Sequence, residues 1–266
     1  MTFHRSLGIE SAGWRNRLRN AVSLPLIHRV LTASAERRQH FLAENLVRRS
    51  KVETIPLGID LSRFCPEPEA RLTIRRELGI ADDHLLVVAA GHFGEEKGID
   101  LALEAVGRTL RDAPHLPIRM AVMGTGERTR VETVQAGGRA WLGDRVVFLG
   151  QRSDPERIFA AADLVVHTPR LEAFGLVVVQ AMACRVAVVA ARVGGLPEIV
   201  IDGVTGVLAP AQDPAATAPL IRSLLESASR RDTLAAAALG RAHQEYTADR
   251  FAERHRALYD RLLGGH

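Results

Sequence analysis

Two segments of the chain combine glycines with polar side chains in a way that suits the binding of a phosphate. The first covers residues 91–98 and directly follows an apolar run. Glycines let the backbone approach a ligand closely, and the lysine ammonium is a compact cation suited to phosphate oxygens. Gly91, His92, Gly94 and Lys97 are therefore candidate phosphate-binding residues. The alternative is an ordinary strand-to-helix loop with a solvated lysine.

The second segment, 169–184, carries more information. Its pattern predicts a helix that begins near Phe174, which leaves the N–H groups of Gly175 and Leu176 free at the positive end of a helix dipole. Glu172 lies just before this helix, where a carboxylate can bind sugar hydroxyls or simply cap the helix. Gln180 lies two turns into the helix on the same face, where its amide could bind a ribose.

A turn at 123–127 contains Gly124 and Gly126, which are spaced like half of a dinucleotide-binding fingerprint. The third glycine of that fingerprint is missing, and so is the acidic residue expected about 20 positions further on. Gly124 remains a candidate for backbone contact with a nucleotide, although a tight turn also explains it. A dinucleotide-dependent oxidoreductase is the function that this pattern supports least.

The elements that must position these segments are short apolar strands alternating with helical stretches from about residue 85 onward. Continuous apolar strands indicate burial on both faces, and alternation with helices indicates a doubly wound parallel sheet of the α/β class. Ligands bind such sheets at the carboxyl ends of the strands, where all three segments lie. The expected strands are 85–90, 118–123, 146–149, 164–166 and 186–190.

The beginning of the chain contains a shorter version of the same pattern. Strands are expected at 30–34 and 52–55, with Ser34 capping a helix that ends near Asn45. Two strands are too few for a complete Rossmann-like domain, so we expect an incomplete α/β domain over 1–58. A larger nucleotide-binding domain then covers 59–266, and its last helix, 248–263, is amphipathic and should pack back on the first part. A fragment, a misplaced start or a second polypeptide that completes the sheet would each explain the small first domain.

The composition narrows the possible partners and the compartment. The net charge is +4, but only two of the 35 basic residues are lysines, Lys51 and Lys97, and no block of five like charges occurs, which argues against a nucleic-acid partner. There is no secretory signal and no apolar run of about 18 residues that could span a membrane. Cys65 and Cys184 have no metal-binding spacing and suit a reducing compartment, so a cytoplasmic location is expected. The basic stretch around Trp14 could contact anionic lipid at the inner face of the membrane, or could be a solvated helix face.

Several motifs in a fixed order resemble the retaining glycosyltransferases of family 4, which have the GT-B fold. The resemblance implies that Lys97 binds the diphosphate of a nucleotide sugar and that Glu172 holds its sugar. It also implies that position 180 contacts the ribose, and that His4 ends a strand of the first domain and reaches the sugar. The pocket would be lined by Phe174, Gly175 and Leu176. The segments that carry the resemblance are 55–60, 169–184, 194–200 and 202–206.

The sequence departs from the family pattern at two binding positions, where His92 replaces an arginine and Gln180 replaces a glutamate. Much of the usual first domain is also absent from the sequence. The implied function is metal-independent, hexosyltransferase-like transfer of a sugar from a nucleotide diphosphate sugar to a glycan or lipid-linked acceptor in bacterial polysaccharide biosynthesis. No metal motif of the Asp-x-Asp type occurs, and no cofactor is expected besides the donor. The alternatives are a non-catalytic nucleotide-sugar-binding domain, or a subunit that needs a separate N-terminal polypeptide.

Overall fold

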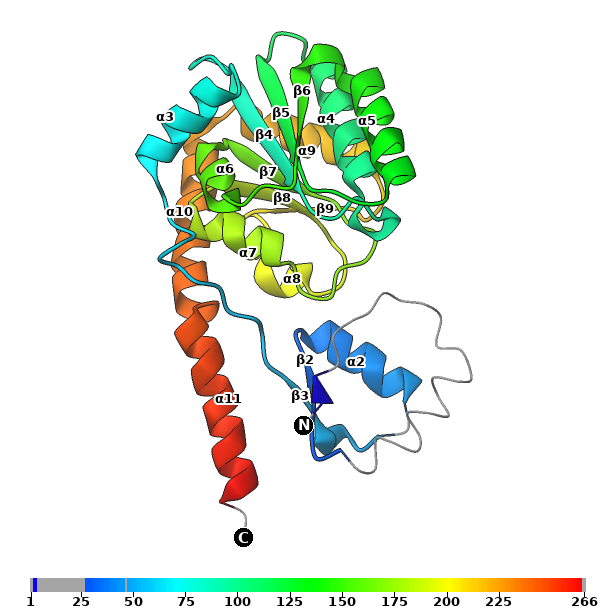
Figure 1. Ribbon diagram of the computed structural model, residues 1–266, viewed down its shortest axis with the longest axis vertical. Helices are drawn as coiled ribbons and strands as arrows, with labels where there is room; N and C mark the ends of the chain where they lie inside the picture. Colours follow the sequence, from blue (N-terminus) through cyan, green and yellow to red (C-terminus); the bar gives the residue numbers. More distant parts are fainter. Residues whose placement is uncertain (1, 4–26, 46, 265–266) are drawn as a thin grey trace.

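A computed structural model describes residues 2–3, 27–45 and 47–264, which form two parallel β-sheets (Figure 1). The larger sheet has the strand order β6-β5-β4-β7-β8-β9, and the smaller has the order β1-β2-β3. The strands of the larger sheet are β4 (Leu85–Ala90), β5 (Ile118–Met123), β6 (Val146–Gly150), β7 (Leu164–His167), β8 (Ala187–Ala191) and β9 (Val207–Ala209). Those of the smaller sheet are β1 (Thr2–Phe3), β2 (Val30–Thr32) and β3 (Val52–Thr54).

Helices cover both faces of the larger sheet, because successive residues of a strand point to opposite faces. In β4, Leu86 and Val88 pack in one hydrophobic cluster and Val87 and Ala89 in another. One face is covered by α3 (Pro68–Glu77), α6 (Pro155–Ala161), α7 (Leu176–Ala183) and α10 (Ala228–Glu245). The other face is covered by α4 (Ile99–Asp112), α5 (Arg128–Leu142) and α9 (Pro214–Leu225). Three short helical segments, η3 (Glu95–Lys97), η4 (Gly143–Arg145) and α8 (Leu196–Ile199), lie in its loops.

The expected strands of the larger domain all occur, with bounds that match or differ by one residue. The pattern did not predict β9, because three apolar residues after a run of turn residues give no clear period. Each strand pairs in parallel with its neighbours, and β7 lies between β4 and β8. The carboxyl ends of β4 and β7 therefore meet at one edge, which brings the loops after Ala90 and His167 together.

The smaller sheet has one strand more than the sequence pattern predicted. β1 pairs in parallel with β2, with Thr2 opposite Val30, and the pattern missed it because two residues are too short to show a period. Strand β2 is followed by α2 (Ala35–Glu44), whose N-cap Ser34 accepts a hydrogen bond from the N–H of Arg37 as expected. A short 3-10 helix, η2 (Arg49–Lys51), leads into β3.

The last helix, α11 (Ala248–Leu263), runs from the larger domain along the smaller sheet (Figure 1). Its Leu258 is fully buried against Leu31 of β2 and Ile55, which follows β3. Where the chain passes from one part to the other, the N–H of Ile59 donates to the carbonyl of Tyr246 at 2.8 Å, and the N–H of Ala248 donates to Ile59 at 2.9 Å. The two passages are thus joined by backbone hydrogen bonds.

Gly58 lies at this crossing and leaves no room for a side chain. A Cβ at this position would collide with the carbonyl oxygen of Thr247 and with the Cβ of Phe251.

Among the helices that the structure describes, none has the length and hydropathy needed to cross a membrane.

Candidate functional site

A cleft of about 1040 Å³ lies between the two sheets, and both parts of the chain line it. One wall is formed by the loops after β4 and β7 and by the start of α7. The other wall is formed by β2, α2 and the segment after β3. The candidate residues among those that line the cleft are Gly91, Lys97, Glu172, Phe174, Gly175 and Leu176.

The centre of the first wall is a carboxylate held between two nitrogen groups. The ammonium nitrogen of Lys97, in η3, lies 3.0 Å from Oε2 of Glu172. Nε2 of His167, the last residue of β7, lies 3.2 Å from the same oxygen. A carboxylate can only accept hydrogen bonds, so the hydrogen shared with His167 belongs to Nε2.

These contacts determine the charge of Glu172. Burial opposes ionisation of its carboxyl group, but the hydrogen bond and charge of His167, together with the Lys97 ammonium, hold the pKa of Glu172 at about 2. Its side chain is 11% exposed, and that of Lys97 is 29% exposed. The site therefore presents an ionised acceptor and a solvent-reached cation side by side.

Backbone contacts fix the two loops that carry Lys97 and Glu172. The N–H groups of Arg170 and Leu171 both donate to the carbonyl of Glu96, at 2.8 Å and 3.2 Å. The guanidinium of Arg170 forms a two-pronged ion pair with Asp100, with N···O distances of 2.9 Å and 2.7 Å. Burial opposes ionisation of Asp100, but Arg170 outweighs it and lowers the pKa of that carboxyl. The two loops are thus held as one unit.

The start of α7 provides free N–H groups beside Glu172. Within the described part of the chain, the N–H groups of Gly175, Leu176 and Val177 have no acceptor. The helix begins at Leu176 rather than near Phe174, because Gly175 has a φ of 115°, outside the helical region. The N–H of Phe174 instead donates to Oε1 of Glu172 at 3.4 Å.

A carboxylate of the larger domain holds the second wall in place. Glu198 accepts hydrogen bonds from the N–H groups of Ala35 and Glu36 at the start of α2, both at 2.8 Å. Next to it, the hydroxyl of Ser34 donates to the carbonyl of Ala173 at 2.7 Å. The loop that carries Glu172 is therefore bonded directly to α2.

The part of α2 that lines the cleft is mostly polar, with Phe41 as its apolar member. Glu36, Arg37 and His40 line the cleft from this helix, and Leu31 and Ile55 line it from the sheet beneath. Residues three apart on a helix lie on the same face, so Arg37 and His40 can contact one ligand together. This wall suits a polar molecule that reaches the cleft from the side opposite Lys97.

Four of the described candidate residues, His92, Gly94, Gly124 and Gln180, do not line the cleft. The exposed ring of His92 accepts a hydrogen bond from the N–H of Gly94 through Nδ1 at 3.0 Å. Gly124 packs against Gly91, and a Cβ there would collide with the Gly91 carbonyl oxygen. Gln180 is half-buried on α7, one turn beyond the part of that helix that faces the cleft. His4 lies outside the described residues, as does the basic stretch around Trp14.

The sequence pattern did not indicate a role for His167 or for Glu198. The signal for His167 was a polar residue at the end of an apolar strand and two positions before Pro169. The signal for Glu198 was its place in a motif that carries the family resemblance. Neither partner could be read from the spacing, because each contact depends on how a loop turns back.

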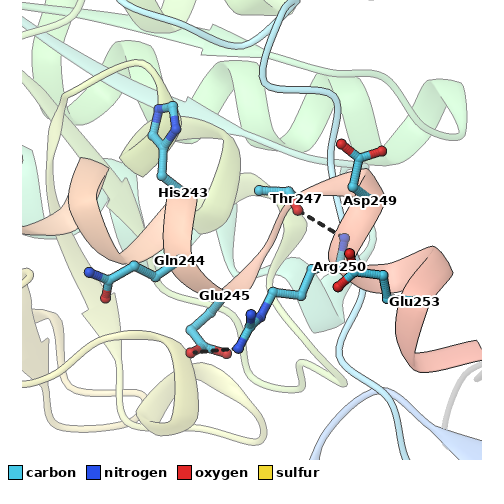
Figure 2. A pocket seen from close by; sticks show the side chains of 7 residues that line it. All are labelled: His243, Gln244, Glu245, Thr247, Asp249, Arg250 and Glu253. Atoms are coloured by element: carbon cyan, nitrogen blue, oxygen red, sulfur yellow. Dashed lines mark hydrogen bonds and ion pairs between the residues drawn. The ribbon is translucent and has the colours of Figure 1, made fainter. Parts of the chain in front are cut away.

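A second depression, of about 470 Å³, lies where α10 meets α11 (Figure 2). Two of its charged groups pair with each other, Arg250 and Glu245 at 3.8 Å, and the backbone N–H of Arg250 donates to the hydroxyl of Thr247 at 3.0 Å. Among the described residues, no group of three or more His, Cys, Asp or Glu side chains could hold a metal ion.

Comparison with known proteins gives a family match over most of the larger domain. The pattern of the family described as glycosyl transferases group 1 matches residues 70–241. The D-inositol 3-phosphate glycosyltransferase of Geodermatophilus obscurus is 38% identical over 196 residues, which cover 69% of this chain and 42% of that protein. The chain spans about half the length of the curated relatives it matches.

Two solved structures share both parts of the architecture. Anabaena Alr3699/HepE in complex with UDP and glucose has a TM-score of 0.87 and 25% identity, over 97% of this chain and 70% of that one. The same protein in complex with UDP-glucose has a TM-score of 0.85 and 26% identity, over 96% and 71%. The expected GT-B type of α/β fold is confirmed.

Proposed function

Because the chain belongs to the family of glycosyl transferases group 1, we propose that it binds a nucleoside diphosphate sugar in the cleft and transfers the sugar to an acceptor. The observation that carries this proposal is the meeting of three groups at one edge of the larger sheet. Lys97, Glu172 and the free N–H groups at Gly175 and Leu176 all line the same cleft. Lys97 and the N–H groups supply positive charge, and Glu172 supplies an ionised acceptor for hydroxyl groups.

The proposed reaction needs these charges at two different places. The bond between the anomeric carbon and the leaving phosphate oxygen breaks, so negative charge grows on the diphosphate and positive charge grows on the sugar. Lys97 and the N–H groups at the start of α7 stabilise the negative charge on the diphosphate, because fixed charges and N–H groups act strongly where charge develops. Glu172 holds the sugar without donating to it. This arrangement works without a divalent ion.

We propose that the configuration of the anomeric carbon is retained. The acceptor oxygen attacks from the face that the diphosphate leaves, and a phosphate oxygen takes the acceptor proton. The proposal therefore gives no side chain the task of general base. It also explains why the first wall needs cations and N–H groups more than it needs a second carboxylate.

The donor and acceptor are suggested by the relatives. The HepE structures hold UDP and UDP-glucose, so UDP is the first nucleotide to try here. The acceptor would lie against α2, where Arg37 and His40 suit a hydroxyl-rich or phosphate-bearing molecule. We propose a step of bacterial glycan or polysaccharide synthesis on a cytoplasmic acceptor that is either free or lipid-linked.

A second candidate is a domain that binds the nucleotide sugar without transferring it, alone or with a separate N-terminal polypeptide. The small size of the sheet beneath α2, with three described strands, favours this alternative. Both candidates predict the same donor site and differ only in turnover.

Calorimetry with UDP and other nucleoside diphosphates, with and without a chelator, tests the donor site. Binding of a nucleoside diphosphate that the chelator leaves unchanged is the expected result. No binding of any of them, or binding that requires magnesium, would overturn the proposal. Release of UDP from UDP-glucose in the presence of acceptor then separates the transferase from the domain that only binds.

A further inference from the structure

We infer that His167 is a positioning residue, which holds the Glu172 carboxylate toward the donor sugar while Lys97 gives its charge to the diphosphate. This inference rests on the proposed function and adds a determinant of sugar binding to it. The observation behind it is that Lys97 and His167 contact the same carboxylate oxygen, Oε2, from different elements.

The two contacts to Oε2 differ in how firmly they are held. Lys97 has a flexible side chain that is 29% exposed, so it can turn toward a ligand in the cleft. The side chain of His167 is 2% exposed, and its backbone is paired in register with Ala190 of β8. His167 therefore keeps its place when a ligand enters, and Lys97 is free to change partners.

A diphosphate would compete with Glu172 for Lys97, because a compact ammonium interacts most strongly with the highest density of negative charge. Glu172 is mostly buried, and a buried carboxylate that loses a partner becomes costly to keep ionised. The contacts that stay are His167 on Oε2 and the N–H of Phe174 on Oε1. Of these two groups, only His167 is a side chain that can be changed.

The loss of affinity should be larger for the nucleotide sugar than for the nucleotide alone. Glu172 is proposed to accept from sugar hydroxyls, and UDP alone has no hexose to present to it. A residue with a merely structural role would weaken UDP and UDP-glucose alike, because both would depend on the same fold. The ratio of the two affinities therefore isolates the positioning role.

The test measures the binding of UDP and of UDP-glucose to the wild-type chain, His167→Leu and His167→Gln. His167→Leu should weaken UDP-glucose by about tenfold more than it weakens UDP, since the hydrogen bond that orients Glu172 toward the hexose is lost. His167→Gln keeps an N–H donor and should recover part of the loss. His115→Leu is the control, because the His115 side chain is 67% exposed and lies outside the cleft.

Equal weakening of both ligands, or no weakening of UDP-glucose, would overturn the inference and leave the proposed function standing. A wild-type chain that binds neither ligand would instead remove the UDP-dependent donor site itself. A second measurement needs no ligand: with ¹⁵N-labelled histidine, the Nε2–H resonance of His167 should shift in Glu172→Gln. It should stay close to its wild-type position in His115→Leu. An Nε2–H resonance that Glu172→Gln leaves unmoved would show that the two side chains do not share this hydrogen.

Discussion

Lys97 and Glu172 form an ion pair, with 3.0 Å between the ammonium nitrogen and the carboxylate oxygen. Each of the two residues is proposed to bind a different end of the donor, so donor binding exchanges one anion for another at Lys97. This exchange limits the cost of binding, because the lysine charge has a partner before and after.

The first prediction concerns the lysine. Lys97→Ala should weaken the binding of UDP by roughly 1.5–3 kcal/mol, the range for hydrogen bonds to charged groups. Calorimetry measures the change. The matched control is Lys51→Ala, because Lys51 donates to the carbonyl of Ile27 in the smaller part and does not line the cleft. Equal affinity of Lys97→Ala and wild type would show that the lysine does not contact the diphosphate.

The second prediction concerns the pH dependence of stability. The pKa of Glu172 is about 2 in the folded chain, below its ordinary 4.5, so its charge stabilises the fold above pH 4.5 and loses this effect as the pH falls toward 2. The difference in unfolding free energy between wild type and Glu172→Gln should therefore shrink over this window, by an amount on the order of 3 kcal/mol. Denaturant titrations at stepwise lower pH measure it. Glu132→Gln, whose carboxylate is exposed, should show no such trend.

The third prediction concerns the contact between the two walls. Glu198→Ala removes the acceptor of two N–H groups at the start of α2, each bonded at 2.8 Å. Hydrogen exchange at Ala35 and Glu36 should become roughly ten- to a hundredfold faster, which corresponds to about 1.5–3 kcal/mol. Glu198→Gln should have a smaller effect, because the amide keeps one oxygen. Unchanged exchange at both positions would contradict this contact.

The fourth prediction separates acceptor from donor. Arg37 lines the cleft from α2, opposite the loops proposed to bind the donor. Arg37→Ala should weaken the binding of inositol 3-phosphate, used as a phosphate-bearing probe in the presence of UDP, by roughly 1.5–3 kcal/mol. The affinity for UDP itself should not change. If the variant loses UDP and probe affinity equally, Arg37 belongs to the donor site. Arg128→Ala, whose side chain is 92% exposed on α5, is the control.

The fifth prediction concerns Gln180, which lies one turn beyond the cleft-facing part of α7 and is proposed to reach the ribose of a bound nucleotide. A charged acceptor bonds a ribose hydroxyl more strongly than an amide, so Gln180→Glu should tighten UDP binding by about 1 kcal/mol. The 2′-deoxyribose analogue should lose most of this gain. Calorimetry of both proteins with both nucleotides gives the comparison. An equal gain with both, or none at all, would mean that position 180 does not touch the ribose.

The sequence predicted the strands of the larger domain well, because buried parallel strands appear as continuous apolar runs. It also indicated that Lys97 and Glu172 belong to loops at one edge of the sheet, and the structure places both in one cleft. It could not predict β1 or β9, since two or three residues carry no measurable period. It placed the start of α7 too early, because the left-handed backbone of Gly175 is not visible in the apolar pattern.

Of the two contacts that the sequence did not predict, one depends on how a single loop turns and the other joins distant segments. In the sequence, His167 only marks the end of an apolar run. Its contact with Glu172 depends on how the loop after β7 turns back. Glu198 lies 163 positions from Ala35, so no local spacing relates them. The contact of Glu198 with Ala35 results from the relative placement of the two sheets, which hydrophobic periodicity does not determine.

The backbone hydrogen bonds between Ile59 and the segment that leads into α11 join the two parts of the chain. The chain crosses between the two sheets twice, and the hydrogen bonds of Ile59 with Tyr246 and Ala248 pin both crossings at one place. Ser34 and Glu198 form further hydrogen bonds between the two parts, beside α2. The parts are therefore joined at two places, which restricts the turning of one part against the other. Because Leu258 is buried against the smaller sheet, α11 is attached to that sheet by packing. A side chain added at Gly58 would collide with Thr247 and Phe251 and displace this crossing, although Gly58 itself does not line the cleft.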